Sequence, residues 1–189
     1  MEIKSIIRRL KGFLIISLWF FCVTVYASPS QLARLEIGMN LLPSVIASNT
    51  RLSFAEDEEK NPLTIYVMYI ENRKLAEQSM QRLTKLDNIR GYPLNIKAVS
   101  IDQLLNTEPD RYSTLINIEP LVNNREQLIQ FCQRNQMLFF SPFKGDVEKG
   151  VMAGYEVTNK VLPAVNLSAL KAANIHLKAF FLRIAVSHD

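Results

Sequence analysis

Apolar stretches that suit strands alternate along this chain with amphipathic stretches that suit helices. The most apolar stretch, residues 63–70, is rich in β-branched and aromatic side chains and predicts a central strand covered on both faces. Further strands and helices are predicted after it in regular alternation. They are the strands 94–99, 112–118 and 137–140 and the helices 73–86, 100–105 and 125–135. This order predicts an α/β fold, a single-domain three-layer sandwich with a mostly parallel sheet.

A helix and a loop are predicted before the central strand. Apolar positions in residues 32–46 repeat at helical spacing, and we expect the helix to be broken near Pro43, because proline removes a backbone donor. Residues 50–62 carry four consecutive acidic side chains at 56–59, which predict an acidic surface loop. Calcium binding is the less favoured interpretation, because these carboxylates lack the glycine-turned spacing of a dedicated calcium loop.

A C-terminal β-hairpin is predicted next. Residues 151–157 alternate between the two faces of a strand, Asn159 suits a tight turn, and residues 161–165 run back beside the first strand. Pro163 has no backbone N–H to donate to a neighbouring strand. We therefore expect the returning strand to lie at an edge of the sheet.

A broken helix is predicted after the hairpin. Asn166 suits the N-cap of a short helix, and Asn174 suits its end, because asparagine tolerates a left-handed conformation. A second helix is predicted beyond Asn174, with one apolar side that packs into the core. The residues on that side are Leu177, Phe180, Phe181 and Ile184.

Three short motifs stand out in this region. They are Val165-Asn166-Leu167, Ala173-Asn174-Ile175 and Phe181-Leu182-Arg183-Ile184-Ala185. They resemble the tail of the YfiR family of small periplasmic proteins, which reads approximately Ile-Asn-Leu, Ala-Gly-Leu and Leu-Leu-Arg-Leu-Ala. The resemblance is close from about Gly150 onward. It implies a dimeric periplasmic regulator that restrains an inner-membrane diguanylate cyclase, and thereby cyclic di-GMP signalling, by contacting the sensor domain of the cyclase.

The first residues predict a secretory signal peptide. A basic start is followed by an apolar run over residues 13–25, and Ala27 supplies the small residue expected at a cleavage site. The apolar run is shorter than the roughly 20 residues that a spanning helix needs, so an uncleaved anchor is the less favoured alternative. We therefore predict residues 1–27 as the signal peptide, cleaved after Ala27, and residues 28–189 as the periplasmic domain.

Charge argues against nucleic-acid binding, and cysteine content limits the disulfides that the chain can form. Loss of the leader removes four basic residues and one acidic residue, which leaves 18 basic and 17 acidic residues and no nucleic-acid-binding stripe. Cys132 is then the single remaining cysteine, and its place in an amphipathic helix favours a buried, inert thiol. Pairing between two copies of the chain through Cys132 is the alternative in an oxidising compartment.

Polar residues follow several of the predicted parallel strands. Because the carboxyl ends of such strands gather at one edge of the sheet, these polar residues predict a crevice for a small polar ligand. Its candidate residues are Glu71, Asn72, Arg73, Asn117, Glu119, Ser141 and Lys144. In the alternative interpretation, Asn72 caps a helix, Arg73 pairs with Glu119, and Ser141 closes a turn.

Catalysis is not expected. The predicted periplasmic domain has two histidines, His176 at the helix break and His188 near an end expected to be disordered. The sequence has no phosphate-binding glycine loop, nucleophile elbow or metal-ligand spacing, so neither a metal nor a cofactor is expected.

The sequence therefore favours a non-catalytic binding protein that modulates an inner-membrane signalling protein. The alternatives are a small-solute-binding component of an ABC-type transporter and an envelope scaffold. The hairpin offers a candidate surface for a partner or for a second copy of the chain, with burial inside the monomer as the alternative. The residues of this surface are Tyr155, Val157 and Val161.

Overall fold

The computed structural model describes residues 29–53 and 61–189. The predicted leader and the acidic residues 56–59 lie outside these ranges. The helices are α2 (Pro29–Ser48), α3 (Arg73–Leu83), α4 (Ile101–Leu105), α5 (Arg125–Arg134), α6 (Leu167–Ala172) and α7 (Ala179–Leu182), with a 3-10 turn η1 at Thr50–Ser53. The strands are β1 (Leu63–Tyr69), β2 (Asn88–Ile89), β3 (Tyr92–Ser100), β4 (Ser113–Asn117), β5 (Leu138–Phe140), β6 (Ala153–Val157), β7 (Val161–Asn166) and β8 (Val186–His188).

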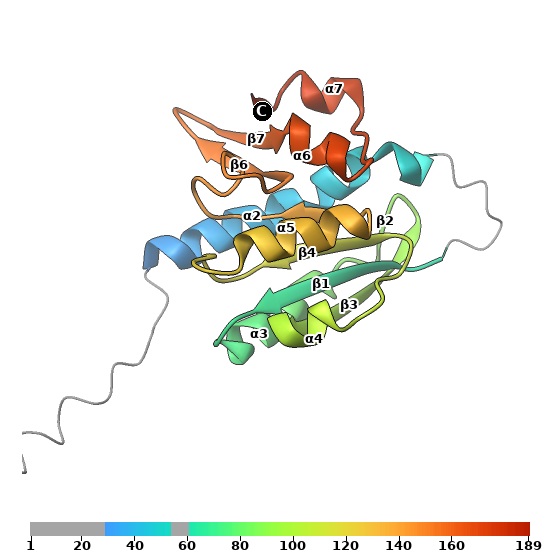
Figure 1. Cartoon of the computed structure of the whole chain (residues 1–189), viewed down its shortest axis with the longest axis vertical. Coiled ribbons are helices and arrows are strands. Elements are labelled where there is room, and N and C mark those ends of the chain that lie inside the picture. The colour runs from blue at the N-terminus through green and yellow to red at the C-terminus, as the bar shows by residue number, and fades with distance from the viewer. Residues whose placement is uncertain (1–28, 54–60) are drawn as a thin grey trace, which may run out of the picture.

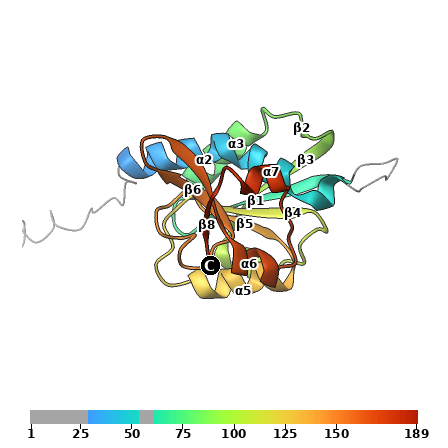
Figure 2. The ribbon, with the colours of Figure 1, turned by 90° about the horizontal axis from the view of Figure 1, so that it is seen from above.

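The strands form one mixed, mostly parallel sheet in the order β2-β3-β1-β4-β5-β6-β7-β8. Only the short β2–β3 pair and the β6–β7 hairpin are antiparallel. Helices α2 and α3 lie on one face of the sheet and α5 and α6 on the other (Figures 1 and 2). The α/β fold with helices on both faces of a largely parallel sheet is therefore confirmed.

Strand β1 lies in the interior of this sheet, between β3 and β4, as its apolar run predicts. It pairs in parallel with β3 on one side, where Ile65 is opposite Ile96, and with β4 on the other, where Ile65 is opposite Thr114. Ile65 and Val67 have no exposed surface. Because each fully buried aliphatic side chain stabilises the folded state by about 1.5–3 kcal/mol, β1 anchors the core that carries the loops at its carboxyl end.

The predicted break at Pro43 is wrong, because α2 runs without interruption from Pro29 to Ser48. Proline costs the helix one backbone hydrogen bond. The turn around it is nevertheless anchored by Leu42, Val45 and Ile46, each at most 2% exposed. Burial of these side chains outweighs the missing bond.

The predicted edge position of the returning strand is also wrong. Strand β8 pairs in parallel with β7 over Ala164–Asn166 and lies outside it at the edge of the sheet. Pro163 lies just before this paired segment, opposite Tyr155 of β6. The missing N–H of Pro163 therefore leaves the β7–β8 ladder intact.

The C-terminal segment follows the prediction as far as Asn174 and in part beyond it, because Leu177 and Phe181 are buried, at 7% and 4% exposed, as predicted. Asn166 caps α6 by accepting a hydrogen bond from the N–H of Ala169 at 2.8 Å, and Asn174 adopts the left-handed conformation with φ 53°. The second helix is wrong in extent, because α7 is a single turn, and Phe180 and Ile184 are 57% and 56% exposed. The chain then forms β8, so His188 belongs to the sheet rather than to a disordered end.

Within residues 29–53 and 61–189, the structure contains no helix with the length and apolar character needed to cross a membrane.

Candidate functional site

The connections of β1 and β4 diverge at the carboxyl edge of the sheet. Strand β1 leads through α3 to β3 on one side, and β4 leads through α5 to β5 on the other. Because β1 and β4 are neighbours, their diverging loops form the topological switch point at which α/β proteins commonly bind ligands. The loops involved are residues 70–72 and 118–122, which carry Glu71, Asn72 and Glu119 of the predicted crevice.

Glu119 joins these two loops. One carboxylate oxygen, Oε2, accepts hydrogen bonds from the backbone N–H groups of Ile70 at 2.7 Å, Glu71 at 3.1 Å and Asn72 at 3.1 Å. Asn72 in turn caps α3, because its Oδ1 accepts a hydrogen bond from the N–H of Leu75 at 3.0 Å. The switch point is therefore held by a carboxylate at the start of a helix, where a negative charge is favourable.

A groove of about 310 Å³ opens above this junction and lies beside the first turns of α2. Its walls are mainly apolar, and three of its side chains are unusually exposed: Val122 at 79%, Leu32 at 44% and Ile70 at 40%. The remaining lining residues are Gln31, Leu35, Glu71, Asn72, Leu75, Ile118, Glu119 and Pro120. We call this feature the switch-point groove.

The groove gathers Glu71, Asn72 and Glu119 among the residues predicted for a polar crevice. Asn72 is a helix cap, as the alternative interpretation held. Arg73 does not pair with Glu119, because its guanidinium donates to Glu77 at 2.9 Å, one helical turn further along α3. The crevice is thus lined mainly by apolar side chains that come from α2 and from the two loops.

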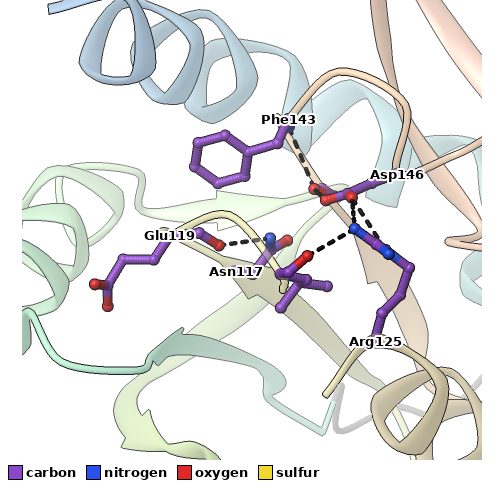
Figure 3. Close-up of polar contacts among 7 residues, drawn as sticks. Asn117, Glu119, Arg125, Phe143 and Asp146 are labelled. Atoms are coloured by element: carbon purple, nitrogen blue, oxygen red, sulfur yellow. Dashed lines mark hydrogen bonds and ion pairs between the residues drawn. The ribbon is translucent and has the colours of Figure 1, made fainter. Parts of the chain in front are cut away.

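Asn117 supports the groove from within the protein. Its side chain is fully buried, and its Nδ2 donates to the backbone carbonyl of Glu119 at 3.0 Å (Figure 3). This bond fixes the turn that follows β4 and so orients the Glu119 carboxylate. The Oδ1 atom of Asn117 is buried without a hydrogen-bond partner in the described part of the chain.

Ser141 belongs to a separate buried network centred on Asp146. The Ser141 hydroxyl donates to Asp146 Oδ2 at 2.6 Å and accepts from the N–H of Phe143 at 3.2 Å. Arg125 donates to Asp146 Oδ1 from Nε at 3.2 Å and from Nη2 at 2.9 Å, and the Asp146 side chain is 4% exposed (Figure 3). Ser141 closes a turn, as the alternative interpretation held. The sequence offered no spacing signal for Arg125 or Asp146.

Lys144 lines a second cavity of about 200 Å³, which we call the hairpin cavity. Its other residues include Arg34, Glu148, Tyr155 and Glu156. The Tyr155 hydroxyl donates to the backbone carbonyl of Arg34 at 2.8 Å, and the Arg34 guanidinium lies 5.1 Å from the centre of the Tyr155 ring. Burial raises the pKa of Tyr155, and the Arg34 charge opposes this rise. The predicted crevice residues are therefore divided among four places: the switch-point groove, the exposed surface of α3, the Asp146 network and the hairpin cavity.

The three residues of the predicted hairpin surface differ in exposure. Tyr155 is 3% exposed and is buried within the monomer, whereas Val157 and Val161 are 54% and 40% exposed. Cys132 on α5 is fully buried, and this burial raises the pKa of its thiol well above the usual range. His176 is exposed and lies 3.2 Å from Asn174 Oδ1, measured from its Nε2 atom.

One solved structure shares the fold of this chain. No family model matches this chain, and no curated protein matches it. Its fold is similar to that of the ABC domain of Streptococcus pneumoniae, whose crystal structure was determined in complex with L-Trp. The two structures align with a TM-score of 0.56 and 9% sequence identity, over 82% of this chain and 60% of the other chain. This chain thus spans less than two thirds of that structure, and the likeness shows a shared α/β architecture.

Proposed function

We propose that this chain is a non-catalytic periplasmic protein that binds and modulates an inner-membrane signalling protein through the switch-point groove. The observation that carries the proposal is the exposed apolar surface of Val122, Leu32 and Ile70 at the carboxyl edge of the sheet. Grouped apolar side chains at such a place are typical of an interaction site.

Binding rather than chemistry is supported by the state of the polar groups beneath the groove. Glu119 is engaged by three backbone N–H groups, and the Asn72 side chain is engaged by the N–H of Leu75. A ligand or partner therefore meets apolar walls above a rigid polar floor. Burying Val122 in an interface would contribute about 1–2 kcal/mol to binding, which corresponds to roughly a tenfold change in affinity.

The partner class rests on the YfiR-like tail motifs. A protein that binds one state of a membrane sensor more tightly than the other shifts the population of that sensor. An inner-membrane diguanylate cyclase is the partner that the resemblance favours, and cyclic di-GMP is then the cellular readout.

Gene deletion with complementation tests this proposal. Deleting the gene is expected to change cellular cyclic di-GMP, and the unaltered chain is expected to restore it. Val122→Asp, which places a charge in the groove, is expected to fail to restore it, whereas Val157→Asp, which places a charge on the alternative hairpin surface, is expected to restore it. Unchanged cyclic di-GMP in the deletion strain under several envelope stresses would contradict the proposal.

A second function, binding of a small solute for an ABC-type transporter, is favoured by one observation. The structurally similar ABC domain was solved with L-Trp, and the switch-point groove has the size of a small ligand pocket. Adding L-Trp and other apolar amino acids to the purified chain tests this alternative. A saturable rise in melting temperature that Val122→Asp abolishes would support solute binding, and no rise at millimolar concentrations would exclude these solutes.

A further inference from the structure

Three side chains with metal-binding atoms converge beside the hairpin cavity. Glu148 comes from the connection between β5 and β6, Glu156 from β6 and His188 from β8. Each offers one nitrogen or oxygen ligand atom, and these atoms all lie within 4.8 Å of one another. His188 Nε2 and Glu156 Oε1 are 2.5 Å apart. One imidazole and two carboxylates from segments that are distant in the sequence thus lie close together.

This donor set suits a zinc ion. Zinc binds imidazole nitrogen and carboxylate oxygen at about 2.0–2.2 Å, so tetrahedral ligand atoms lie about 3.3–3.6 Å from one another. That separation falls between the 2.5 Å of the His188–Glu156 contact and the 4.8 Å that bounds the cluster. Glu148 is exposed, so its side chain can rotate toward the other two, while His188 and Glu156 would move slightly apart to admit the ion. Calcium, in contrast, needs six to eight oxygen ligands.

We propose that Glu148, Glu156 and His188 bind one Zn²⁺ ion, with the fourth coordination position open. The two carboxylates balance the charge of the ion when the imidazole is neutral. They also place two negative charges close together, and a bound cation reduces the repulsion between them.

Two basic residues line the neighbouring cavity and oppose cation binding. The Arg34 guanidinium lies over the Tyr155 ring at 5.1 Å, so part of its charge is compensated by that ring. Lys144 is exposed, and its charge is therefore screened by solvent.

The site has a structural consequence for the end of the chain. The backbone of strand β8 pairs with the sheet at three residues of β7, Ala164–Asn166. A zinc ion would tie β8 to β6 and to the connection that carries Glu148. Metal binding is therefore expected to stabilise the folded chain. It is also expected to protect the last residues from amide hydrogen exchange and from proteolysis.

Zinc titration of the full chain, purified without a histidine tag and treated with a chelator, tests the proposal. Competition with a chromophoric zinc chelator is expected to give one ion per chain, with binding at least tenfold weaker in His188→Gln. His176→Gln, which changes the chain's other histidine, is the matched control and is expected to bind zinc as the unaltered chain does. Far-ultraviolet circular dichroism checks that both variants are folded.

Glu148→Gln provides a second variant at an exposed position, where misfolding does not complicate the result. It is also expected to weaken zinc binding at least tenfold and to reduce the zinc-induced rise in melting temperature. Absence of stoichiometric binding would overturn the proposal. Equal weakening by His176→Gln and His188→Gln would do so too, as would an equal response to calcium.

Discussion

Glu119 and Asn72 lie in different loops, and the Glu119 carboxylate accepts a hydrogen bond from the backbone N–H of Asn72 at 3.1 Å. The same oxygen accepts from the N–H groups of Ile70 and Glu71. The loops after β1 and β4 are therefore held together by one side chain, and this junction forms the floor of the switch-point groove. The apolar walls above it are positioned by the same contact.

Removal of the Glu119 carboxylate is expected to destabilise the chain. Glu119→Ala leaves three N–H groups without their acceptor, which should lower the free energy of unfolding by about 1–3 kcal/mol. Glu119→Gln keeps an amide oxygen and should lower it less. Urea denaturation measures both effects, with Glu108→Ala at an exposed carboxylate as the control. Equal stability of Glu119→Ala and Glu108→Ala would refute the role of Glu119.

The Arg125–Asp146 pair should contribute far more to stability than the exposed Arg73–Glu77 pair. The Asp146 side chain is 4% exposed, whereas the Arg73 and Glu77 side chains are 75% and 46% exposed. Asp146→Ala leaves Arg125 unpaired and should cost about 3 kcal/mol in unfolding free energy. Glu77→Ala should have no measurable effect. Chemical denaturation measures the free energy of unfolding of both variants. Similar losses would show that burial does not determine how much these ion pairs stabilise the fold.

Gly38→Ala is expected to destabilise the chain, although alanine is normally the better helix former by about 1 kcal/mol. A Cβ atom at position 38 of α2 would lie 2.5 Å from Pro142 Cβ, and proline cannot rotate away. The resulting displacement should cost about 1–3 kcal/mol. Ser44→Ala, at an exposed position of the same helix, is the control and should be neutral or slightly stabilising. A rise in melting temperature for Gly38→Ala would show that α2 does not pack against Pro142 in this way.

The Cys132 thiol is expected to be unreactive in the folded chain. It is fully buried, and burial raises its pKa well above the usual range, so the reactive thiolate is suppressed at neutral pH. A thiol-alkylating reagent should modify the peptide that contains Cys132 only after denaturation, as mass spectrometry can measure. The same burial disfavours a disulfide between two folded copies. Rapid alkylation under native conditions would contradict the burial.

The local parts of the fold could be predicted from the sequence because they depend on neighbouring residues. The apolar run of β1, the cap at Asn166 and the left-handed Asn174 are examples. The end of the chain could not be predicted in this way. Phe180 and Ile184 fit a helical spacing, but the open edge of β7 offers hydrogen bonds to residues 186–188, and a strand forms there instead.

The part of the candidate site that lies at the ends of neighbouring parallel strands could be predicted from the sequence. Glu71, Asn72 and Glu119 meet because β1 and β4 end at the same edge. Ser141 and Lys144 lie elsewhere, because the chain after β5 turns toward Asp146 and Arg125, a contact that no sequence spacing announces. The contribution of α2 to the groove was missed for a similar reason, since it depends on how a distant helix packs.

Photo-crosslinking in living cells tests whether the switch-point groove contacts an inner-membrane signalling protein. A photoreactive amino acid placed at position 122 in the switch-point groove is compared with one at position 157 on the hairpin. A covalent adduct with an inner-membrane signalling protein is expected from position 122 and none from position 157. Adducts from position 157 alone, or no adduct with any membrane protein from position 122, would contradict binding through the switch-point groove.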